Sequence, residues 1–238
     1  MSLVKKGTEA KASIQKEKID LKQAFIRLKN ENESIPVRVL GVEDYVTYKT
    51  HSDFNKKLFN TPCLEPLGEF CPYCVAKEKG GEEWSGFYAK ERAMFAFADL
   101  NSGQVKVLEV SKGQAKKLIA QIEEYADEIE AGEVAFNLTR TGSGQSTGYS
   151  LNMMTAKKMQ AVQDKFNAFD GVTVDVDFFE DRLVVKSATY MVNLLEDAGF
   201  DVDANFDASL VATARAEKEA LMGKDEAKPI EDDTDVPF

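Results

Sequence analysis

The residue types best suited to binding a soft metal ion gather in one short stretch of this sequence. The chain contains one histidine and three cysteines, and all four lie between positions 51 and 74 as His51, Cys63, Cys71 and Cys74. Zinc binds neutral imidazole nitrogen and thiolate sulfur in a tetrahedron, and a C-x2-C pair presents two sulfurs from one tight turn. Because four protein ligands leave no position for an activated water, the sequence predicts one structural, noncatalytic Zn²⁺.

The same residues allow two other interpretations. Cys71-Pro72-Tyr73-Cys74 matches the glutaredoxin active-site tetrapeptide, which would make the protein a thiol oxidoreductase. That fold needs a buried strand before the motif and a long helix after it, whereas LEPLGEF precedes it here and the glycine-broken VAKEKGGEEWSG follows. The third interpretation is a set of unlinked buried thiols with a surface histidine. Because residues 51–91 are poor in aliphatic side chains, we expect a metal to supply folding energy there.

The flanking sequence indicates a small β-barrel. Residues 35–48 are rich in Val and Tyr and predict one or two strands, and residues 92–110 predict a hairpin that turns at Asn101, Ser102 and Gly103. Residues 111–132 have the apolar spacing of a helix, and strand-like runs at 133–141 and 147–153 follow. This order is that of an OB-type barrel, although other small barrels share it. We therefore expect a mainly β, α+β protein: a five-stranded OB-fold barrel with an inserted zinc-binding subdomain.

The remaining elements are predicted from shorter patterns. Leu21, Phe25 and Leu28 have helical spacing. Beyond Thr155 the sequence predicts a helix at 155–168, a β-type stretch at 172–179, a short strand at 182–187, and helices at 189–198 and 207–222. The expected organisation is a basic N-terminal arm and helix at 1–34, an OB-fold core with helical additions at 35–50 and 92–222, a zinc subdomain at 51–91, and a disordered acidic tail at 223–238.

Charge is distributed unevenly along the chain. The net charge of −11 argues against a nucleic-acid ligand, because phosphate binding depends on Lys and Arg. However, residues 1–169 hold 24 Lys and Arg against 23 Asp and Glu, whereas residues 170–238 hold 6 against 18. The front of the chain can therefore present a basic surface while the C-terminal part carries the negative balance.

The metal-ligand set resembles the zinc site of the replication single-stranded DNA-binding proteins of T-even and other tailed bacteriophages, which are OB-fold proteins with a His-Cys-Cys-Cys subdomain. The intervals and the C-P-x-C turn are similar, as are the basic-aromatic FYAKERAMFAF, the hairpin at Gly103-Gln104-Val105 and the basic helix start SKGQAKKL. Separately, the terminal EDDTDVPF resembles the acidic D-x-P-F tail of bacterial-type single-stranded DNA-binding proteins. The resemblance covers about residues 35–155 and the last eight.

This resemblance implies a sequence-independent coat protein, not an enzyme, for single-stranded DNA in phage replication, recombination and repair. The acidic tail would recruit partner replication or recombination enzymes through Asp232, Asp233, Asp235, Val236, Pro237 and Phe238. The lysines of the N-terminal arm, Lys5, Lys6, Lys11, Lys16 and Lys18, would support cooperative self-association on DNA. With no long apolar stretch and no apolar signal segment at its start, the protein is expected in the cytoplasm, of the host cell if phage-encoded.

Binding of an unpaired strand needs lysines or arginines that follow phosphates and exposed rings on which bases stack, at about 1–3 kcal/mol per base. The sequence offers both types at Tyr45, Tyr48, Lys49, Phe54, Lys56, Lys57, Tyr73, Trp84, Tyr88, Lys90, Arg92, Arg140 and Tyr149. About half of the rings are expected in the core. Tyr73 and Trp84, in polar loops, are the stronger stacking candidates. A zinc-dependent adaptor that binds only proteins through its tail remains the main alternative, and a metal nuclease is disfavoured.

Overall fold

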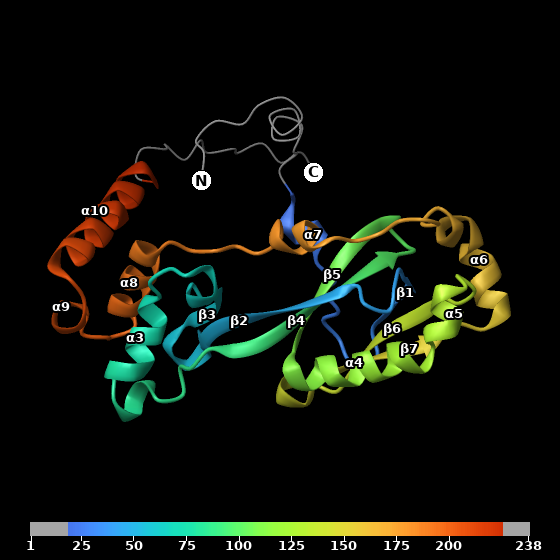
Figure 1. Ribbon diagram of the computed structural model, residues 1–238, viewed down its shortest axis with the longest axis horizontal. Helices are drawn as coiled ribbons and strands as arrows, with labels where there is room; N and C mark the ends of the chain where they lie inside the picture. Colours follow the sequence, from blue (N-terminus) through green and yellow to red (C-terminus); the bar gives the residue numbers. More distant parts are fainter. Residues whose placement is uncertain (1–18, 226–238) are drawn as a thin grey trace, which may run out of the picture. The chain divides into compact units, whose positions relative to one another are not determined.

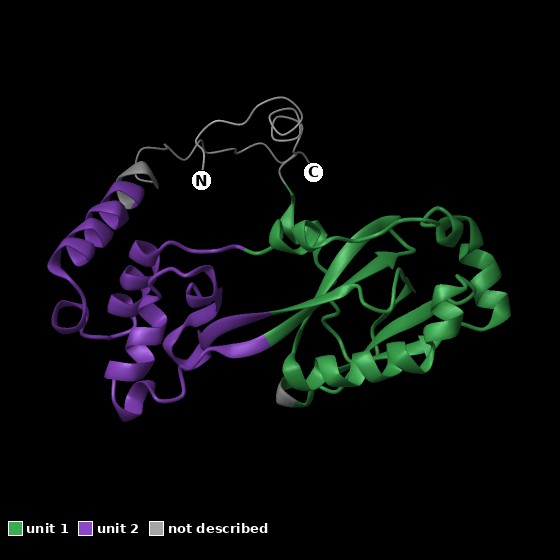
Figure 2. Cartoon of the chain, in the orientation of Figure 1, with its two compact units in different colours: residues 1–47, 92–183 green, residues 48–91, 184–238 purple. Residues whose placement is uncertain are grey.

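The computed structural model describes residues 19–225 and divides into two compact units (Figures 1 and 2). Unit 1 combines the described residues up to 47 with residues 92–183, and unit 2 combines residues 48–91 with those from 184 onward. The predicted arm lysines at 5–18 and the tail residues at 232–238 lie outside the described residues. Within those residues, no helix is both long and apolar enough to cross a bilayer.

The strands form one curled antiparallel sheet, and the fold class is α+β as expected (Figure 1). The order is β3-β2-β4-β1-β6-β7, with β5 also paired to β4. The strands are β1 (Ser34–Val39), β2 (Tyr45–Asp53), β3 (Leu58–Pro62), β4 (Lys90–Asp99), β5 (Gln104–Ser111), β6 (Phe136–Thr141) and β7 (Gly148–Met153). β2 and β4 each contribute residues to both units.

The predicted hairpin at 92–110 is confirmed as β4 and β5. Residues 93–100 of β4 and its turn are all buried. Phe95 and Phe97 enter one core cluster, while Ala98 and Leu100 enter another, as the alternation of side chains in a strand requires. Gly103 ends the turn with φ of 71°, which glycine adopts without steric cost. This hairpin therefore contributes to two core clusters of unit 1.

The helix predicted at 111–132 is present but interrupted. α4 (Lys112–Glu124) starts with a capping box between Ser111 and Gln114, and α5 (Ala126–Glu130) follows after Tyr125. The Tyr125 ring packs against Phe136, with 5.4 Å between the ring centroids. The two strands predicted after this helix are confirmed as β6 and β7, and the next helix as α6 (Ala156–Asn167).

Three of the elements predicted from the sequence are wrong. The amphipathic helix expected through Leu28 is a single turn, α2 (Leu21–Ala24), because the chain then pairs with β5: the Ile26 N–H donates to the Val107 carbonyl at 2.8 Å. Alternate residues Ala24, Ile26 and Leu28 are buried, which is the period of extended chain.

The β-type stretch predicted at 172–179 and the strand predicted at 182–187 are also absent. Asp175 instead caps a short helix, α7 (Val176–Glu180), by accepting a hydrogen bond from the Phe178 N–H. Val184 and Val185 are about half exposed. Although these valines favour strands, no strand of the described sheet pairs with this segment.

Unit 2 contains α3 (Pro72–Lys79), α8 (Ala188–Asp197), α9 (Val202–Asn205) and α10 (Ala208–Asp225) together with β3 and most of β2. The helices predicted near 189–198 and 207–222 are thus confirmed as α8 and α10, and both belong to unit 2. Met191, Val192 and Leu195 of α8 share one buried cluster with Leu58 and Tyr73. The stretch that contains the candidate ligands therefore has a larger apolar core than its own sequence suggests.

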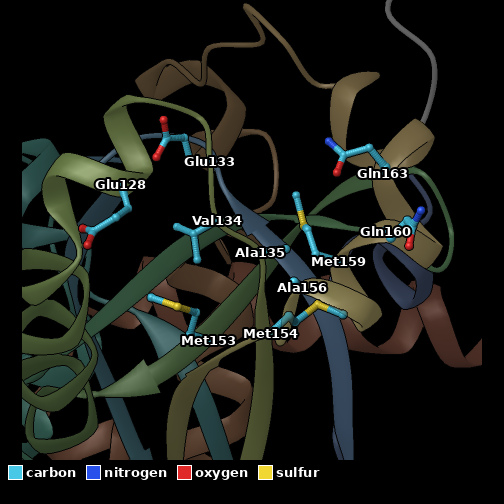
Figure 3. A pocket seen from close by; sticks show the side chains of 10 residues that line it. All are labelled: Glu128, Glu133, Val134, Ala135, Met153, Met154, Ala156, Met159, Gln160 and Gln163. Carbon is cyan, nitrogen blue, oxygen red and sulfur yellow. The ribbon is translucent and has the colours of Figure 1, made fainter.

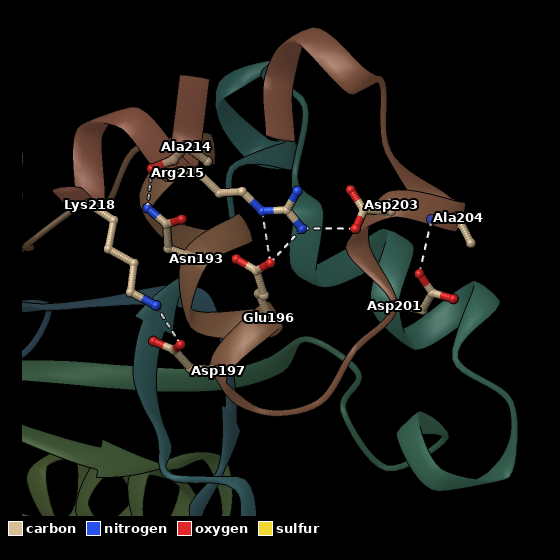
Figure 4. Close-up of polar contacts among 9 residues, drawn as sticks. All are labelled: Asn193, Glu196, Asp197, Asp201, Asp203, Ala204, Ala214, Arg215 and Lys218. Atoms are coloured by element: carbon tan, nitrogen blue, oxygen red, sulfur yellow. Dashed lines mark hydrogen bonds and ion pairs between the residues drawn. The ribbon is translucent and has the colours of Figure 1, made fainter. Parts of the chain in front are cut away.

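Polar contacts connect the C-terminal helices (Figure 4). The Arg215 guanidinium pairs with Glu196 at 2.6 Å and with Asp203 at 2.8 Å, so one side chain connects α8, α9 and α10. The buried Asn193 side-chain N–H donates to the Ala214 carbonyl at 2.7 Å. These contacts connect helices whose apolar residues share a buried cluster with Cys63 and Cys71.

Candidate metal centre

Three elements of unit 2 bring the four candidate ligands together. His51 lies in β2, Cys63 directly follows β3, Cys71 is the N-cap residue of α3, and Cys74 lies in its first turn. In the β2–β3 ladder, His51 pairs with Thr61, and the Cys63 N–H donates to the Lys49 carbonyl at 2.9 Å. The hairpin therefore places the imidazole beside Cys63, and α3 supplies the other two sulfurs.

The ligand atoms have the spacing of a tetrahedral metal site. The Cys63 sulfur lies 3.9 Å from the Cys71 sulfur and 3.5 Å from the Cys74 sulfur. The His51 Nε2 lies 3.9 Å from the Cys71 sulfur and 3.3 Å from that of Cys74. With Zn–S near 2.3 Å and Zn–N near 2.0 Å, a tetrahedron has edges of about 3.8 Å between sulfurs and about 3.5 Å between sulfur and nitrogen. All four atoms lie within 4.8 Å of one another, so they are positioned to hold one metal ion.

The orientation of His51 suits a metal ligand. Its Nδ1 lies 2.9 Å from the Phe87 carbonyl oxygen, which can only accept a hydrogen bond. Nδ1 therefore carries the proton, and the lone pair of Nε2 faces the three sulfurs. A backbone carbonyl that fixes the tautomer in this way is the usual outer partner of a metal-bound histidine. The side chain is 1% exposed, so this arrangement is protected from water.

Without a cation, the three sulfurs cannot all be ionised. Burial raises the pKa of Cys63, and burial together with the neighbouring Cys71 raises the pKa of Cys74. For Cys71, burial also acts to raise the pKa, but its contact with His51 and hydrogen bonds from the backbone of Leu64 and Cys74 lower it to about 6. A bound cation stabilises every thiolate, so metal binding would release protons from this cluster.

The surroundings of Cys71 and Cys74 differ from those that a glutaredoxin-type site needs. The three cysteines, all within the described residues, are free thiols. Cys71 is only 3% exposed, and His51 and Cys63 lie against it. A disulfide exchange site needs an accessible thiolate as nucleophile. In addition, a 3-10 turn and a loop precede the motif instead of a strand, and α3 ends at Gly80.

Tyr73 and Trp84 are not in open loops. They are 0% and 3% exposed and belong to the core cluster of unit 2, where both rings contact Phe87. Neither ring has a face available for a base in this conformation. The sequence prediction placed both rings in open loops because their sequence neighbours are polar. The buried cluster that contains them includes Met191 and Phe200, which are distant in the sequence.

The other predicted DNA-binding residues divide by exposure. In unit 2, Phe54 is 66% and Tyr88 51% exposed, and the side chains of Lys49, Lys57 and Lys90 are exposed. Lys56 lies over the Trp84 ring and pairs with Glu83. Four other members of the predicted set make contacts inside unit 1. The Tyr45 ring packs against Phe95, Arg92 pairs with Glu109, Arg140 donates to the Thr147 hydroxyl, and Tyr149 packs against the core. Tyr48 is half-buried.

An exposed ring beside Phe54 was missed from the sequence. Phe59 is 66% exposed and contacts Phe54, with 6.0 Å between the ring centroids. The signal was the alternation in Leu58-Phe59, because Leu58 is buried and the next residue of a strand must point the other way.

Unit 1 contains a separate groove of about 580 Å³ (Figure 3). Met153, Met154 and Met159 form much of its lining, and Glu128 and Glu133 lie at its edge. It includes no candidate metal ligand and no residue of the predicted DNA-binding set.

Comparison of the chain with protein-family models and with curated proteins found no match.

Proposed function

We propose that the protein binds single-stranded DNA without sequence preference and that a structural Zn²⁺ at His51, Cys63, Cys71 and Cys74 stabilises unit 2. The supporting observation is the contrast between the interior and the surface of this unit. Three of the four ligands are buried and Cys74 is half-buried, and a metal held by all four would have no coordination position for a substrate. The surface, in contrast, exposes aromatic rings and lysines, the two groups that bind unpaired strands.

Tyr88 and Lys90 illustrate this surface. The Tyr88 ring is half exposed, and the Lys90 ammonium lies 5.3 Å from its centroid. Tyr88 directly follows Phe87, whose carbonyl orients His51, so the candidate metal centre and this ring are connected through adjacent residues. A base could stack on the ring while Lys90 contacts a phosphate, each independently of base identity.

The curled sheet is compatible with the OB-type barrel that such proteins use, and we include that fold in the proposal. We also propose that the acidic tail recruits replication or recombination enzymes, as in phage replication and repair. Deleting residues 232–238 should then abolish partner binding while DNA affinity at low salt stays equal or rises. Loss of DNA affinity would contradict the assignment of the tail to partners.

The test of DNA binding is anisotropy of labelled oligo-dT, with a duplex of equal length for comparison, between 20 and 300 mM salt. Single-strand affinity should fall with salt at a logarithmic slope of about −0.7 per phosphate contacted. Tyr88→Ala should weaken binding roughly 5- to 150-fold, which corresponds to about 1–3 kcal/mol per stacked base.

A matched control is available in the same unit. Tyr190 is 38% exposed, and the Lys186 ammonium lies 4.6 Å from its ring centroid, yet this pair is outside the predicted set. Tyr190→Ala should leave affinity unchanged. Absence of single-strand binding by the intact protein at 20 mM salt would refute the proposal, and tail-dependent partner binding in that case would identify a protein-only adaptor.

A further inference from the structure

The tip of the β2–β3 hairpin, residues 53–59, exposes two phenylalanine rings. Phe54 and Phe59 are each 66% exposed and meet edge to face, with an interplanar angle of 65°. Full burial of a phenylalanine contributes about 1.5–3 kcal/mol, most of which these rings do not gain within the chain. Two adjacent exposed rings therefore form a surface suited to an apolar or aromatic ligand.

The backbone of the tip is held by its own hydrogen bonds. The Asp53 carboxylate accepts from the Asn55 N–H at 3.0 Å and from the Lys56 N–H at 3.4 Å, which caps a 3-10 turn. The Lys57 N–H closes this turn on the Phe54 carbonyl at 3.2 Å. The Asp53 carboxylate is thus engaged with the backbone of the tip.

Side chains anchor the same tip to the core of unit 2. The Lys56 ammonium lies 4.6 Å from the Trp84 ring centroid and pairs with Glu83 at 2.5 Å. Leu58, between Lys57 and Phe59, is 1% exposed. Since residues on both sides of the exposed groups are fixed, the two rings are preorganised, and a ligand would not have to order them.

Lys57 occupies an unusual backbone conformation. Its φ is 58° and its ψ is 24°, in the left-handed region where a residue with a side chain is less stable than glycine by about 1 kcal/mol. The side chain is exposed and, within the described part of the chain, makes no ion pair. The tip therefore places an unneutralised positive charge between the two phenylalanines in the sequence.

We propose that this tip is a nucleobase-stacking site: one unpaired base lies on the outer face of Phe54 or Phe59, and Lys57 contacts the adjoining phosphate. The inference depends on the proposed function and assigns it to particular residues. A base cannot lie between the two rings, because a sandwich needs parallel rings roughly 7 Å apart, twice the usual carbon contact distance, whereas these are tilted with centroids 6.0 Å apart.

Charge favours a nucleic-acid strand over a second copy of this chain. In a two-fold symmetric contact the same surface meets itself, so the Lys57 ammonium of one copy would approach that of the other. A polyanionic strand instead supplies the opposite charge. The faces of bases in a duplex are covered by their neighbours, which makes unpaired DNA the expected ligand.

Lys57→Gly gives the sharpest test, because it separates binding from folding. It should reduce affinity for oligo-dT and make the logarithmic salt slope shallower by about 0.7, the effect of one lost phosphate contact. The melting temperature followed by Trp84 emission should stay equal or rise, because glycine relieves the left-handed backbone. Phe54→Ala and Phe59→Ala should weaken binding, the stacked ring by roughly 5- to 150-fold, without lowering that temperature.

Leu67→Ala and Lys77→Gln serve as controls, because Leu67 is 60% exposed and Lys77 is an exposed lysine elsewhere in unit 2. Both should bind oligo-dT like the parent protein. Unchanged affinity of all three tip variants, with an intact parent that binds, would overturn the stacking site but leave the proposed function standing. Failure of the parent to bind would remove both. Loss of concentration-dependent self-association in sedimentation, with DNA binding unchanged, would reassign the tip to a second copy.

Discussion

Replacing Cys74 by serine should destabilise unit 2 selectively. A structural Zn²⁺ with four protein ligands contributes about 10–16 kcal/mol to folding of a small module. If the ligands contribute comparably, loss of one sulfur removes roughly a quarter, about 2.5–4 kcal/mol. For a unit of this size, that change lowers the melting temperature by roughly 10–30 °C. The core shared with α8 and α10 should still allow folding at low temperature.

The chain contains a built-in reporter for this measurement. Trp84 is the sole tryptophan, is 3% exposed, and packs against Phe87 and Phe200 inside unit 2. Selective excitation of tryptophan during a thermal melt therefore follows unit 2 alone, while far-ultraviolet circular dichroism follows both units. The variant should show an early shift of Trp84 emission to longer wavelength and a later transition from unit 1.

Val75→Ala is the matched control, because it changes the neighbouring half-buried residue and spares every ligand. It should cost about 1 kcal/mol through lost packing and retain one zinc per chain. Metal quantitation on each sample, under reducing conditions, completes the test. A parent protein that contains no zinc, or a Trp84 transition that neither chelation nor Cys74→Ser shifts, would refute the metal assignment.

Two further predictions concern folding. The pKa of Asp99 is affected first by burial, which raises it, but the Lys106 ammonium at 2.8 Å and neighbouring donors hold it below its ordinary value. This pair therefore stabilises the fold above about pH 4 and is lost on acidification below that. Asp99→Asn should cost about 1.5–3 kcal/mol at pH 7 and reduce the acid dependence of unit 1 melting, and an unaltered acid profile would contradict this. Gly80→Ala would place a Cβ 2.4 Å from the Trp84 ring and should therefore lower the melting temperature of unit 2. Gly86→Ala, which has open space around its Cβ, should leave that temperature unchanged. Equal effects of the two substitutions would contradict the predicted clash.

Local signals in the sequence predicted the features that depend on near neighbours. The hairpin at Gly103, the helix start at Ser111 and the clustering of the four candidate ligands all involve short separations along the chain. Turn and capping chemistry decide such features without tertiary context. For this reason β4, β5, α4 and the ligand set could be predicted before the structure was known.

The errors arise where distant residues decide the structure. Trp84 lies in a polar stretch, yet it packs against Phe200 and shares a buried cluster with Met191, both more than 100 positions away. The valines near 172–185 favour strands, but pairing partners are absent among the described strands. Phe25 follows helical spacing, but its segment pairs with Val107. Single-sequence patterns do not reveal such partners.

The discontinuity of unit 2 has a consequence for biosynthesis. The ligand-bearing segment ends at residue 91, and α8, which packs on it, begins at Ala188. At translation rates of about 5–20 residues per second, the three thiols emerge roughly 5–20 s before the helices that cover them. During this interval the nascent cysteines are accessible both to metal and to oxidants, so early loading with an ion would protect them until the final helices leave the ribosome.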